Sequence, residues 1–430
     1  MVSAGWLRRG SLDEKGLAQP QITRLGTGSL AREPVHKPAN RITRLGTTNV
    51  TKNQPDGPAI AHRPLGKTGL SIPTVVFGAT CLGNLFVEMS DGDKRELIQQ
   101  WLAHMPAPVA IDSAGKYGAG LSLEVLGREL KALGVKPGDV ILSNKLAWRR
   151  VPLTTPEPTF EPGVWIGLKH DAVQDISYDG ILRCYDDGCR MLGDYRPQLV
   201  SVHDPDEYLA ATEDREDRRR RLDDILGAYR ALEELRDAGQ VSGVGVGAKD
   251  WRTIRELSSL CRLDWVMMAN SFTVLNHPPE LVRFIDTLAE RQIGLINSAV
   301  MHGGFLGGGN FFDYRPIDPA DREDARRLQW RDQFAQICQR HERSPFQVAV
   351  AFGLSHPGVA AVALSTSQPG RVGEMVSAAL GDIPSALWSE LRGLGLIDAD
   401  YPHLETSKGG STDDRGDDSG SGPPASLAGR

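Results

Sequence analysis

The sequence predicts a single (β/α)8 barrel, and three observations support this prediction. The chain has 430 residues, of which 40% are hydrophobic, which is enough for one barrel with a large buried core. It alternates eight short apolar runs with longer stretches of helical apolar spacing, as expected for parallel strands covered on both faces. Polar residues close several of these runs, at positions that would face the mouth of a barrel. A doubly wound parallel sheet is the alternative fold.

The eight apolar runs lack clear polar alternation, which favours strands buried on both faces. The stretches between them have helical spacing, as in DDILGAYRALEELRDAG at 223–239, where Gly239 is a typical stop signal. Each strand with its following helix makes one unit of the barrel. In chain order the strands are expected at residues 74–80, 108–113, 139–145, 198–204, 241–248, 264–271, 293–299 and 359–366.

Two of the expected connections are longer than usual. One follows the third strand and spans residues 148–177, and the other follows the seventh strand and spans residues 301–323. Long connections that leave the mouth of a barrel are often binding loops or lids. The charged run EDREDRRRRLDD at 213–224 fits a solvated helix start better than a docking patch.

Both ends of the chain differ from its middle in composition. Residues 1–60 contain few large apolar side chains, an excess of Arg and Lys, and a near repeat, ITRLGTGS at 22–29 and ITRLGTTN at 42–49. Residues 405–430 are rich in Gly, Ser and Asp. Neither segment can bury enough apolar surface to fold, so we expect two disordered extensions around a barrel domain at 61–404. A basic arm that binds a partner is the alternative for the first segment.

Charge and cysteine content exclude several classes of protein. The net charge of −6 and the pI near 6.0 provide no basic field for nucleic acid. No apolar run approaches the roughly 18 residues of a membrane helix, and the first residues do not resemble a secretory signal. The five cysteines never occur as CxxC, which argues against a disulfide framework and a zinc site. We therefore expect a cytoplasmic protein that acts on a small molecule without a metal; its oligomeric state is left open.

Three successive strands end on ionisable residues. Asp112 ends the second strand, Lys145 the third and His203 the fourth, while Tyr117 lies in the loop just after the second. Taken alone, each has an ordinary structural explanation, namely a helix cap, a surface charge, a hydrogen-bonded core histidine and loop packing. In a barrel these strand ends converge on one mouth, so the four side chains are expected to meet there.

Together, these four residue types suit proton transfer to or from an oxygen atom. Tyrosine has a reference pKa of about 10, but a nearby lysine cation lowers it, and an aspartate keeps the lysine charged and oriented. A histidine beside the phenol can hydrogen-bond a carbonyl or alcohol oxygen and fix its position. The set fits a reaction in which hydride leaves or reaches a carbon while a proton moves at its oxygen.

The segment IDSAGKYGAG, with NK at 144–145 and VHD at 202–204, resembles the pattern of the aldo-keto reductase family. The resemblance covers about residues 64–400. Three further segments are similar to the branch of D-threo-aldose 1-dehydrogenase (L-fucose dehydrogenase) and pyridoxal 4-dehydrogenase. They are DISYDGILRCYDDGCRMLG at 175–193, VSVHDPDEYL at 201–210 and IPSALWSELRGLGLID at 383–398.

The resemblance implies a TIM-barrel oxidoreductase that uses NAD or NADP. Tyr117 would be the acid/base, Lys145 and Asp112 its tuning pair, and His203 the residue that orients the substrate oxygen. The implied reaction is oxidation of an aldose at C1 to the lactone; reduction of an aldehyde or ketone and oxidation of pyridoxal are alternatives. Two other classes stay open, a Schiff-base aldolase that uses Lys145 and a nucleotide-binding regulatory module with negligible turnover.

The resemblance also implies a set of cofactor contacts, although the chain departs from the family pattern in places. Gly247, Ala248 and Lys249 stand where many relatives have a Ser-Asn pair that holds the nicotinamide. Asn297 stands where an aromatic residue often stacks on it. The expected cofactor contacts are Gly78, Asn270, Asn297, Ser298, Ser365, Thr366, Ser367, Gln368, Arg371 and Glu374.

Cofactor choice and substrate contacts rest on a few side chains. A neutral Gln368 in place of a cation, together with Glu374, favours NAD, while Arg371 offers a route to NADP. Trp148 and Trp165, in the long segment after the third strand, are the expected substrate contacts because their rings can stack on a sugar. The alternative is that these rings form the private core of their own loop.

Overall fold

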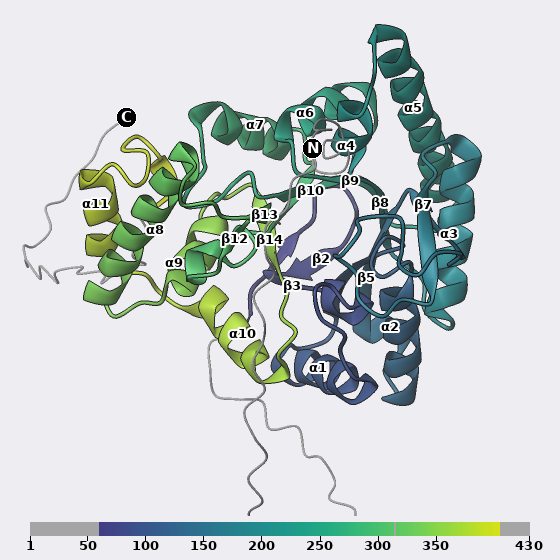
Figure 1. Ribbon diagram of the computed structural model, residues 1–430, viewed down its shortest axis with the longest axis horizontal. Coiled ribbons are helices and arrows are strands. Elements are labelled where there is room, and N and C mark those ends of the chain that lie inside the picture. The colour runs from purple at the N-terminus through teal and green to yellow at the C-terminus, as the bar shows by residue number, and fades with distance from the viewer. Residues whose placement is uncertain (1–59, 314, 405–430) are drawn as a thin grey trace, which may run out of the picture. The chain divides into compact units, whose positions relative to one another are not determined.

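Eight parallel strands in the described part of the chain close into a barrel, which confirms the predicted fold (Figure 1). Their order around the barrel follows their order in the sequence, and the last strand pairs with the first. Each predicted apolar run supplies one strand. The barrel strands are β3 (Val75–Gly78), β4 (Val109–Ala114), β5 (Val140–Leu146), β8 (Leu199–His203), β9 (Gly243–Ala248), β10 (Trp265–Ala269), β11 (Gly294–Ser298) and β14 (Val359–Leu364).

The computed structural model describes residues 60–313 and 315–404. The expected extensions before residue 60 and after residue 404 lie outside this range, as does the ITRLGT repeat. The boundaries expected for the barrel domain therefore stay a prediction.

Helices surround the barrel and connect its strands, as the alternation in the sequence predicts (Figure 1). The fifth helix begins at Arg215, because Asp214 caps it by accepting backbone N–H groups, so the charged run at 213–224 is the start of a helix as expected. No described helix is long and apolar enough to cross a bilayer. The helices are α1 (Asp91–His104), α2 (Leu121–Ala132), α3 (Tyr178–Leu192), α4 (Pro205–Ala210), α5 (Arg215–Asp237), α6 (Trp251–Leu260), α7 (Pro279–Glu290), α8 (Arg322–Arg340), α9 (Pro345–Gly353), α10 (Val372–Leu380) and α11 (Ser385–Gly393).

Side chains that point into the barrel alternate along each strand, so one face can be followed from the bottom of the barrel to its mouth. On β4, Ala110 packs in the bottom layer, and Asp112 is the next inward residue. On β8, Leu199 packs in the bottom layer, and His203 lies four residues further along the strand, toward the mouth. On β5, Lys145 likewise lies toward the mouth, four residues after Ile141 of the bottom layer. The apolar bottom layer consists of Leu65, Ile72, Val76, Ala110, Ile141, Leu199, Trp265, Met267, Ile296, Ala360 and Ala361.

An antiparallel hairpin before the barrel closes its bottom. β1 (His62–Pro64) pairs with β2 (Ser71–Pro73), and the hairpin contributes Leu65 and Ile72 to the bottom layer. Both side chains are at most 1% exposed. The bottom of the barrel is therefore closed by apolar side chains.

The two long connections contain more regular structure than the sequence indicated. After β5, the strands β6 (Trp148–Pro152) and β7 (His170–Gln174) pair antiparallel, so residues 148–177 form a hairpin with a broad tip. After β11, a 3-10 helix (Phe305–Gly307) precedes the short pair β12 (Phe311–Phe312) and β13 (Arg315–Pro316). β6 has no fully buried residue, so it lacks the apolar run that marks the barrel strands.

Candidate active site

Asp112 and Lys145 form a buried ion pair at the mouth of the barrel. The Lys145 ammonium donates to one carboxylate oxygen of Asp112 and lies 3.5 Å from the carbonyl oxygen of Ser113. The hydroxyl of Ser143 donates to the other carboxylate oxygen at 2.9 Å. Both charged side chains are at most 4% exposed. Because a buried charge persists only when it is paired, this arrangement keeps a cation fixed at the mouth.

Gly247 on β9 makes room for the Lys145 side chain. A Cβ atom at Gly247 would lie 2.8 Å from Cδ of Lys145 and 3.6 Å from its Cγ. Gly243, on the same face of β9 nearer the bottom, is similarly crowded by Thr68, whose Cγ2 would lie 2.5 Å from an added Cβ. The alternating glycines of VSGVGVGA therefore free the inner face of β9 for side chains from other elements.

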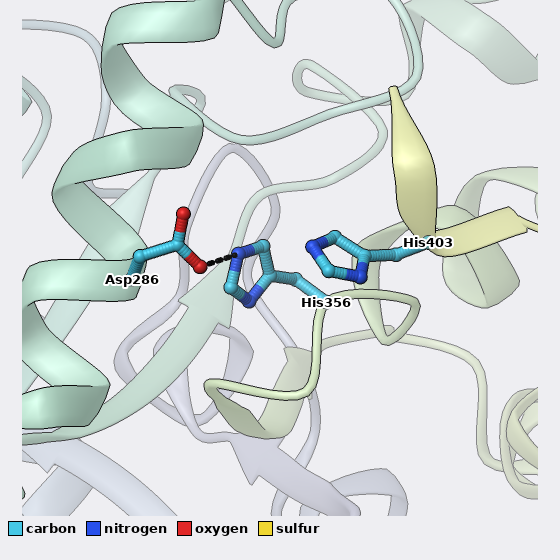
Figure 2. Close-up of side chains that lie close together, drawn as sticks. All are labelled: Asp286, His356 and His403. Carbon is cyan, nitrogen blue, oxygen red and sulfur yellow. Dashed lines mark ion pairs between the residues drawn. The ribbon is translucent and has the colours of Figure 1, made fainter. Parts of the chain in front are cut away.

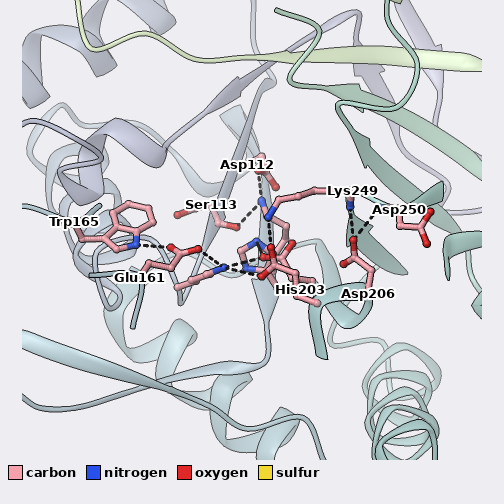
Figure 3. Close-up of polar contacts among 12 residues, drawn as sticks. Asp112, Ser113, Glu161, Trp165, His203, Asp206, Lys249 and Asp250 are labelled. Carbon is pink, nitrogen blue, oxygen red and sulfur yellow. Dashed lines mark hydrogen bonds and ion pairs between the residues drawn. The ribbon is translucent and has the colours of Figure 1, made fainter. Parts of the chain in front are cut away.

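Tyr117 and His203 meet beside this ion pair. The Lys145 ammonium lies 4.7 Å from the centre of the Tyr117 ring, and that ring packs edge-on against the His203 imidazole with 5.6 Å between ring centroids. Burial holds the pKa of His203 well below its usual value, and the Asp204 carboxylate opposes this shift only in part. The imidazole is therefore neutral near pH 7. The mouth thus holds all four residues expected there. Figure 3 shows two of them, Asp112 and His203, among the polar contacts of the mouth.

The hairpin after β5 supplies an aromatic wall beside Tyr117. The Trp165 ring lies 5.8 Å from the Tyr117 ring between centroids. Phe160 packs between the two tryptophans, 6.2 Å from Trp165 and 5.9 Å from Trp148. These rings belong to a small core of the loop itself, yet Trp165 also borders the site. The substrate role expected of Trp148 and Trp165 stays a prediction.

A second buried lysine, Lys116, lies next to Tyr117 in the chain, and the local sequence does not predict its burial. Its ammonium contacts Asp204 and Glu161 (Figure 3). The partner Asp204 is 88 residues away, so no local pattern reveals the pair. The one available signal is a lysine placed between small residues and an aromatic ring at the end of a buried strand.

Residues expected near the nicotinamide end of a cofactor lie around the mouth. A Cβ atom at Gly78 would lie 3.3 Å from Cβ of Ser365, so the glycine allows β3 and the segment after β14 to approach closely. Asn270 follows β10, and its buried Oδ1 accepts no hydrogen bond from any described residue. Ser298 ends β11 and donates to a backbone carbonyl oxygen at 3.3 Å. A buried amide oxygen of this kind suits an amide N–H donor, which the nicotinamide carboxamide carries, so these residues fit the cofactor.

Asn297 lies in the wall of the barrel. It is fully buried, and its amide nitrogen donates to the carbonyl oxygens of Phe272 at 2.9 Å and Gly353 at 3.1 Å. Its neighbour Ile296 packs inside the barrel, so strand alternation directs Asn297 outward. The side chain ties β11 to the end of α9, and the cofactor contact expected of Asn297 stays a prediction.

The segment expected at the phosphate end of the cofactor connects β14 to α10. Residues 365–368 are exposed or half-buried, and the Thr366 hydroxyl accepts the backbone N–H of Gln368 at 3.1 Å. Arg371, directly before α10, forms an ion pair with Glu374 on the first turn of that helix, with 3.3 Å between Nε and Oε2. Both of these side chains are about half exposed. The cation that would favour a phosphate is therefore already paired with a carboxylate.

One group of possible metal ligands in the described residues lies before β14, at the bottom of the barrel (Figure 2). Nε2 of His356 is 3.2 Å from Asp286 Oδ1, and the His403 ring centroid is 4.4 Å from that of His356. Nδ1 of His356 accepts the backbone N–H of Gly358 at 3.0 Å, which leaves the ring proton on Nε2, facing the carboxylate. A metal needs the lone pair of that nitrogen, so the group suits a hydrogen-bonded tie better than a metal.

The comparisons with known proteins agree with this geometry. The model of the aldo/keto reductase family matches residues 74–394. Pyridoxal 4-dehydrogenase from Microbacterium luteolum is 30% identical over 346 residues, which are 78% of this chain and 97% of that protein. D-threo-aldose 1-dehydrogenase from a Pseudomonas species is 28% identical over 348 residues, which are 76% of this chain and 96% of that protein.

Two solved structures share the fold. An aldo-keto reductase from Bacillus halodurans, in its holo form, aligns with a TM-score of 0.58 at 19% identity, over 80% of this chain and 100% of that one. The glycerol dehydrogenase of Gluconobacter oxydans aligns with a TM-score of 0.56 at 17% identity, over 77% of this chain and 95% of that one. With the family model matching most of the barrel, the chain belongs to the aldo/keto reductase family of oxidoreductases.

Proposed function

We propose that the protein oxidises an aldose of the L-fucose or D-threo type at C1 to the lactone, with NAD or NADP as hydride acceptor and Tyr117 as acid/base. The observation that carries the proposal is the position of Lys145, whose ammonium is bound by Asp112 and lies 4.7 Å from the centre of the Tyr117 ring. The similarity to D-threo-aldose 1-dehydrogenase supports the substrate class.

Tyr117 moves the proton in this proposal. The neighbouring cation stabilises the phenolate form, which takes the proton of the C1 hydroxyl while the C1–H bond breaks and a carbonyl forms. A bound nicotinamide cofactor supplies the acceptor for the hydride. Asp112 contributes indirectly, because its carboxylate keeps Lys145 charged and at a fixed position inside the barrel.

His203 orients the sugar. Its ring packs against the Tyr117 ring, so the phenol and the imidazole approach one substrate oxygen from neighbouring directions. Because burial keeps the imidazole neutral, one ring nitrogen carries a proton and can donate it in a hydrogen bond to that oxygen. Such positioning holds the C1 hydroxyl near the phenolate and reduces the entropy lost on reaching the transition state.

For the cofactor, we propose contacts from Gly78, Asn270 and Ser298 at the nicotinamide end and from residues 365–368 at the phosphate end. NAD should be used at least as efficiently as NADP. Gln368 brings no charge to the ribose, and the Glu374 carboxylate partly neutralises Arg371, the nearest cation in this segment.

We place the reaction in the cytoplasm. The five cysteines are free thiols in the structure, and three of them are buried. Burial raises the pKa of Cys81 to about 11, which keeps this thiol protonated and unreactive near neutral pH. Free and unreactive thiols fit a reducing compartment.

Oxidation of pyridoxal is the second candidate. A relative 30% identical over most of the chain is named pyridoxal 4-dehydrogenase. The Trp165 ring packs beside Tyr117, and an aromatic border of this kind suits a flat pyridine ring as well as a sugar. Both substrates present a hydroxyl on a hemiacetal carbon, so the same four residues would serve either reaction.

A substrate panel tests the proposal. The formation of reduced cofactor, measured by absorbance, would be compared for L-fucose, other aldoses, pyridoxal and simple aldehydes, each with NAD and with NADP. We expect the highest kcat/KM for an aldose with NAD. A higher value for pyridoxal would select the second candidate. Tight cofactor binding without turnover of any compound would instead indicate a nucleotide-binding regulatory module.

A further inference from the structure

Lys116 is buried, although lysine is rarely buried unless it is paired. Its side chain is 4% exposed, and its ammonium lies 2.8 Å from Glu161 Oε1, 2.9 Å from Asp204 Oδ2 and 3.6 Å from Glu207 Oε2. Burial alone would lower the pKa of Lys116, but the three carboxylates raise it above its usual value. The ammonium therefore stays charged; it donates a hydrogen bond to Asp204 and forms ion pairs with Glu161 and Glu207.

The acidic partners of Lys116 are attached to the residues that border the site. Asp204 directly follows His203 in the chain. Glu161 lies in the hairpin after β5, and its second carboxylate oxygen accepts the indole N–H of Trp165 at 2.7 Å. Lys116 itself directly precedes Tyr117. One ammonium thus joins three segments, each of which carries one ring of the site. Figure 3 shows two of these rings, Trp165 and His203.

Lys116 contacts Asp204 at a backbone turn of uncommon conformation. Asp204 has a φ of 51°, in the left-handed region that residues with a side chain adopt only when their surroundings hold them there. Its N–H donates to the Gly247 carbonyl oxygen at 2.8 Å, and its carboxylate is the one that binds Lys116. Asp204, directly after His203, is therefore held by a backbone hydrogen bond to Gly247 and by the contact of its carboxylate with Lys116.

We propose that Lys116 is a positioning residue that acts in two directions, through Asp204 on the separation of Tyr117 and His203 and through Glu161 on the placement of Trp165 against Tyr117. The inference rests on the proposed role of Tyr117. Lys116 would thereby fix two distances between ring centroids, 5.6 Å between Tyr117 and His203 and 5.8 Å between Tyr117 and Trp165.

The two directions have different kinetic consequences. The Asp204 contact fixes the relative position of Tyr117 and His203, the two groups that act on the reacting oxygen. A misplacement of about 1 Å of such groups can cost roughly 10²-fold in rate. The Glu161 contact sets a wall that touches the rest of the substrate, so its loss weakens binding equally in the ground state and the transition state. Asp204 therefore controls kcat, and Glu161 controls KM.

Two isosteric variants separate these effects, each assayed with NAD and the panel substrate that the wild type oxidises fastest. Asp204→Asn should lower kcat by about 10-fold or more with KM within about 2-fold. Glu161→Gln should raise KM by about 5-fold or more with kcat within about 2-fold. Lys116→Met should show both changes, but it leaves buried carboxylates without a cation, which can unfold the protein. The test therefore relies on the two isosteric variants and not on Lys116→Met.

The matched control is Asp264→Asn. Asp264 also forms a largely buried ion pair, with Arg236 at 2.9 Å, but it precedes β10 at the bottom of the barrel. The Asp264→Asn substitution should lower the stability of the protein and leave kcat and KM unchanged. The proposal is overturned if both mouth variants keep wild-type kcat and KM, or if the control shows the same kinetic changes. A fully active Tyr117→Phe, assayed in parallel, would instead overturn the proposed function.

Discussion

The ammonium of Lys145 lies 4.7 Å from the centre of the Tyr117 ring, inside a barrel mouth where both Lys145 and its partner Asp112 are almost completely buried. Charges interact more strongly in such surroundings than in water, because the effective dielectric constant is lower. A negative charge on the phenol is therefore stabilised more by this lysine than by an exposed one. This position supports the electrostatic role proposed for Lys145 and the proton transfer proposed for Tyr117.

Replacing Lys145 by Met removes the cation and keeps the aliphatic stem. Turnover should fall by about 10²-fold or more, and the pH midpoint of oxidation should move to higher pH because the phenolate loses its neighbouring charge. The dependence of kcat on pH between about 6 and 10 checks this expectation. Lys94→Met, which removes a buried lysine from α1, is the control, and it should leave the midpoint in place. A wild-type midpoint in Lys145→Met would exclude the electrostatic role.

Gly247→Ala tests whether the inner face of β9 is shaped for Lys145. An added Cβ would lie 2.8 Å from Lys145 Cδ, so the lysine must shift away from its present position. We expect kcat to fall by about 10-fold or more, with a loss of stability of about 1–3 kcal/mol from overpacking. Gly243→Ala crowds Thr68 at the bottom of the same strand and should reduce stability alone. Equal kcat values for the two variants would contradict this account.

Gln368→Arg should shift cofactor preference toward NADP. A guanidinium at this position would make a charge-assisted contact with the ribose phosphate, and kcat/KM for NADP should rise by about 10-fold relative to NAD. Gln368→Met, which adds no charge, is the control. The comparison is made by steady-state kinetics with both cofactors. A wild-type enzyme that already prefers NADP strongly would show that Arg371 or another cation supplies the phosphate contact.

Acid should weaken the fold through two histidines that accept backbone hydrogen bonds. Nε2 of His277 accepts from Asp398 N–H and Nδ1 of His356 from Gly358 N–H, each at 3.0 Å. Burial lowers the pKa of His277, and burial together with His403 lowers that of His356 to about 4. Unfolded histidines take up protons near pH 6.5, so the unfolded state binds more protons below that pH. The free energy of unfolding should therefore fall between pH 6.5 and about 4, by at most about 1.4 kcal/mol per pH unit for each histidine.

Two substitutions isolate this acid effect. His277→Gln keeps an acceptor near the Nε2 position and His356→Asn keeps one near the Nδ1 position, and neither replacement titrates. Urea unfolding at several pH values between about 4 and 7 should show a flatter pH dependence in the double variant. The same slope in the wild type and the double variant would show that other groups control acid unfolding.

The barrel was predictable because apolar runs without polar alternation mark strands buried on both faces, and stretches of helical spacing separate them along the chain. Asp112, Lys145 and His203 stand where an inward-facing position reaches the end of a strand, so the topology alone brings them together. Contacts across the barrel leave no such local trace. The sequence shows that Gly247 is small but not that Lys145 occupies its space.

The same limit explains why the contacts of Lys116 and of Asn297 were not predicted. Lys116 and Asp204 are 88 residues apart, and only the folded barrel brings them into contact. Asn297 stands at a strand end like the others, but alternation turns its side chain into the wall, where it binds backbone carbonyl groups. The β6–β7 hairpin lacks apolar runs, because β6 has no fully buried residue and β7 has only Asp171 and Ala172.

Turnover of Tyr117→Phe is the most direct test of the central claim. The substitution keeps the ring that packs on His203 and Trp165 and removes only the phenolic oxygen. Single-turnover oxidation should slow by roughly 10²- to 10⁴-fold, as is typical when a general acid/base is lost, while the Kd for the cofactor stays close to the wild-type value. Near-normal turnover by folded, cofactor-bound Tyr117→Phe would contradict the mechanism and leave Tyr117 with a packing role alone.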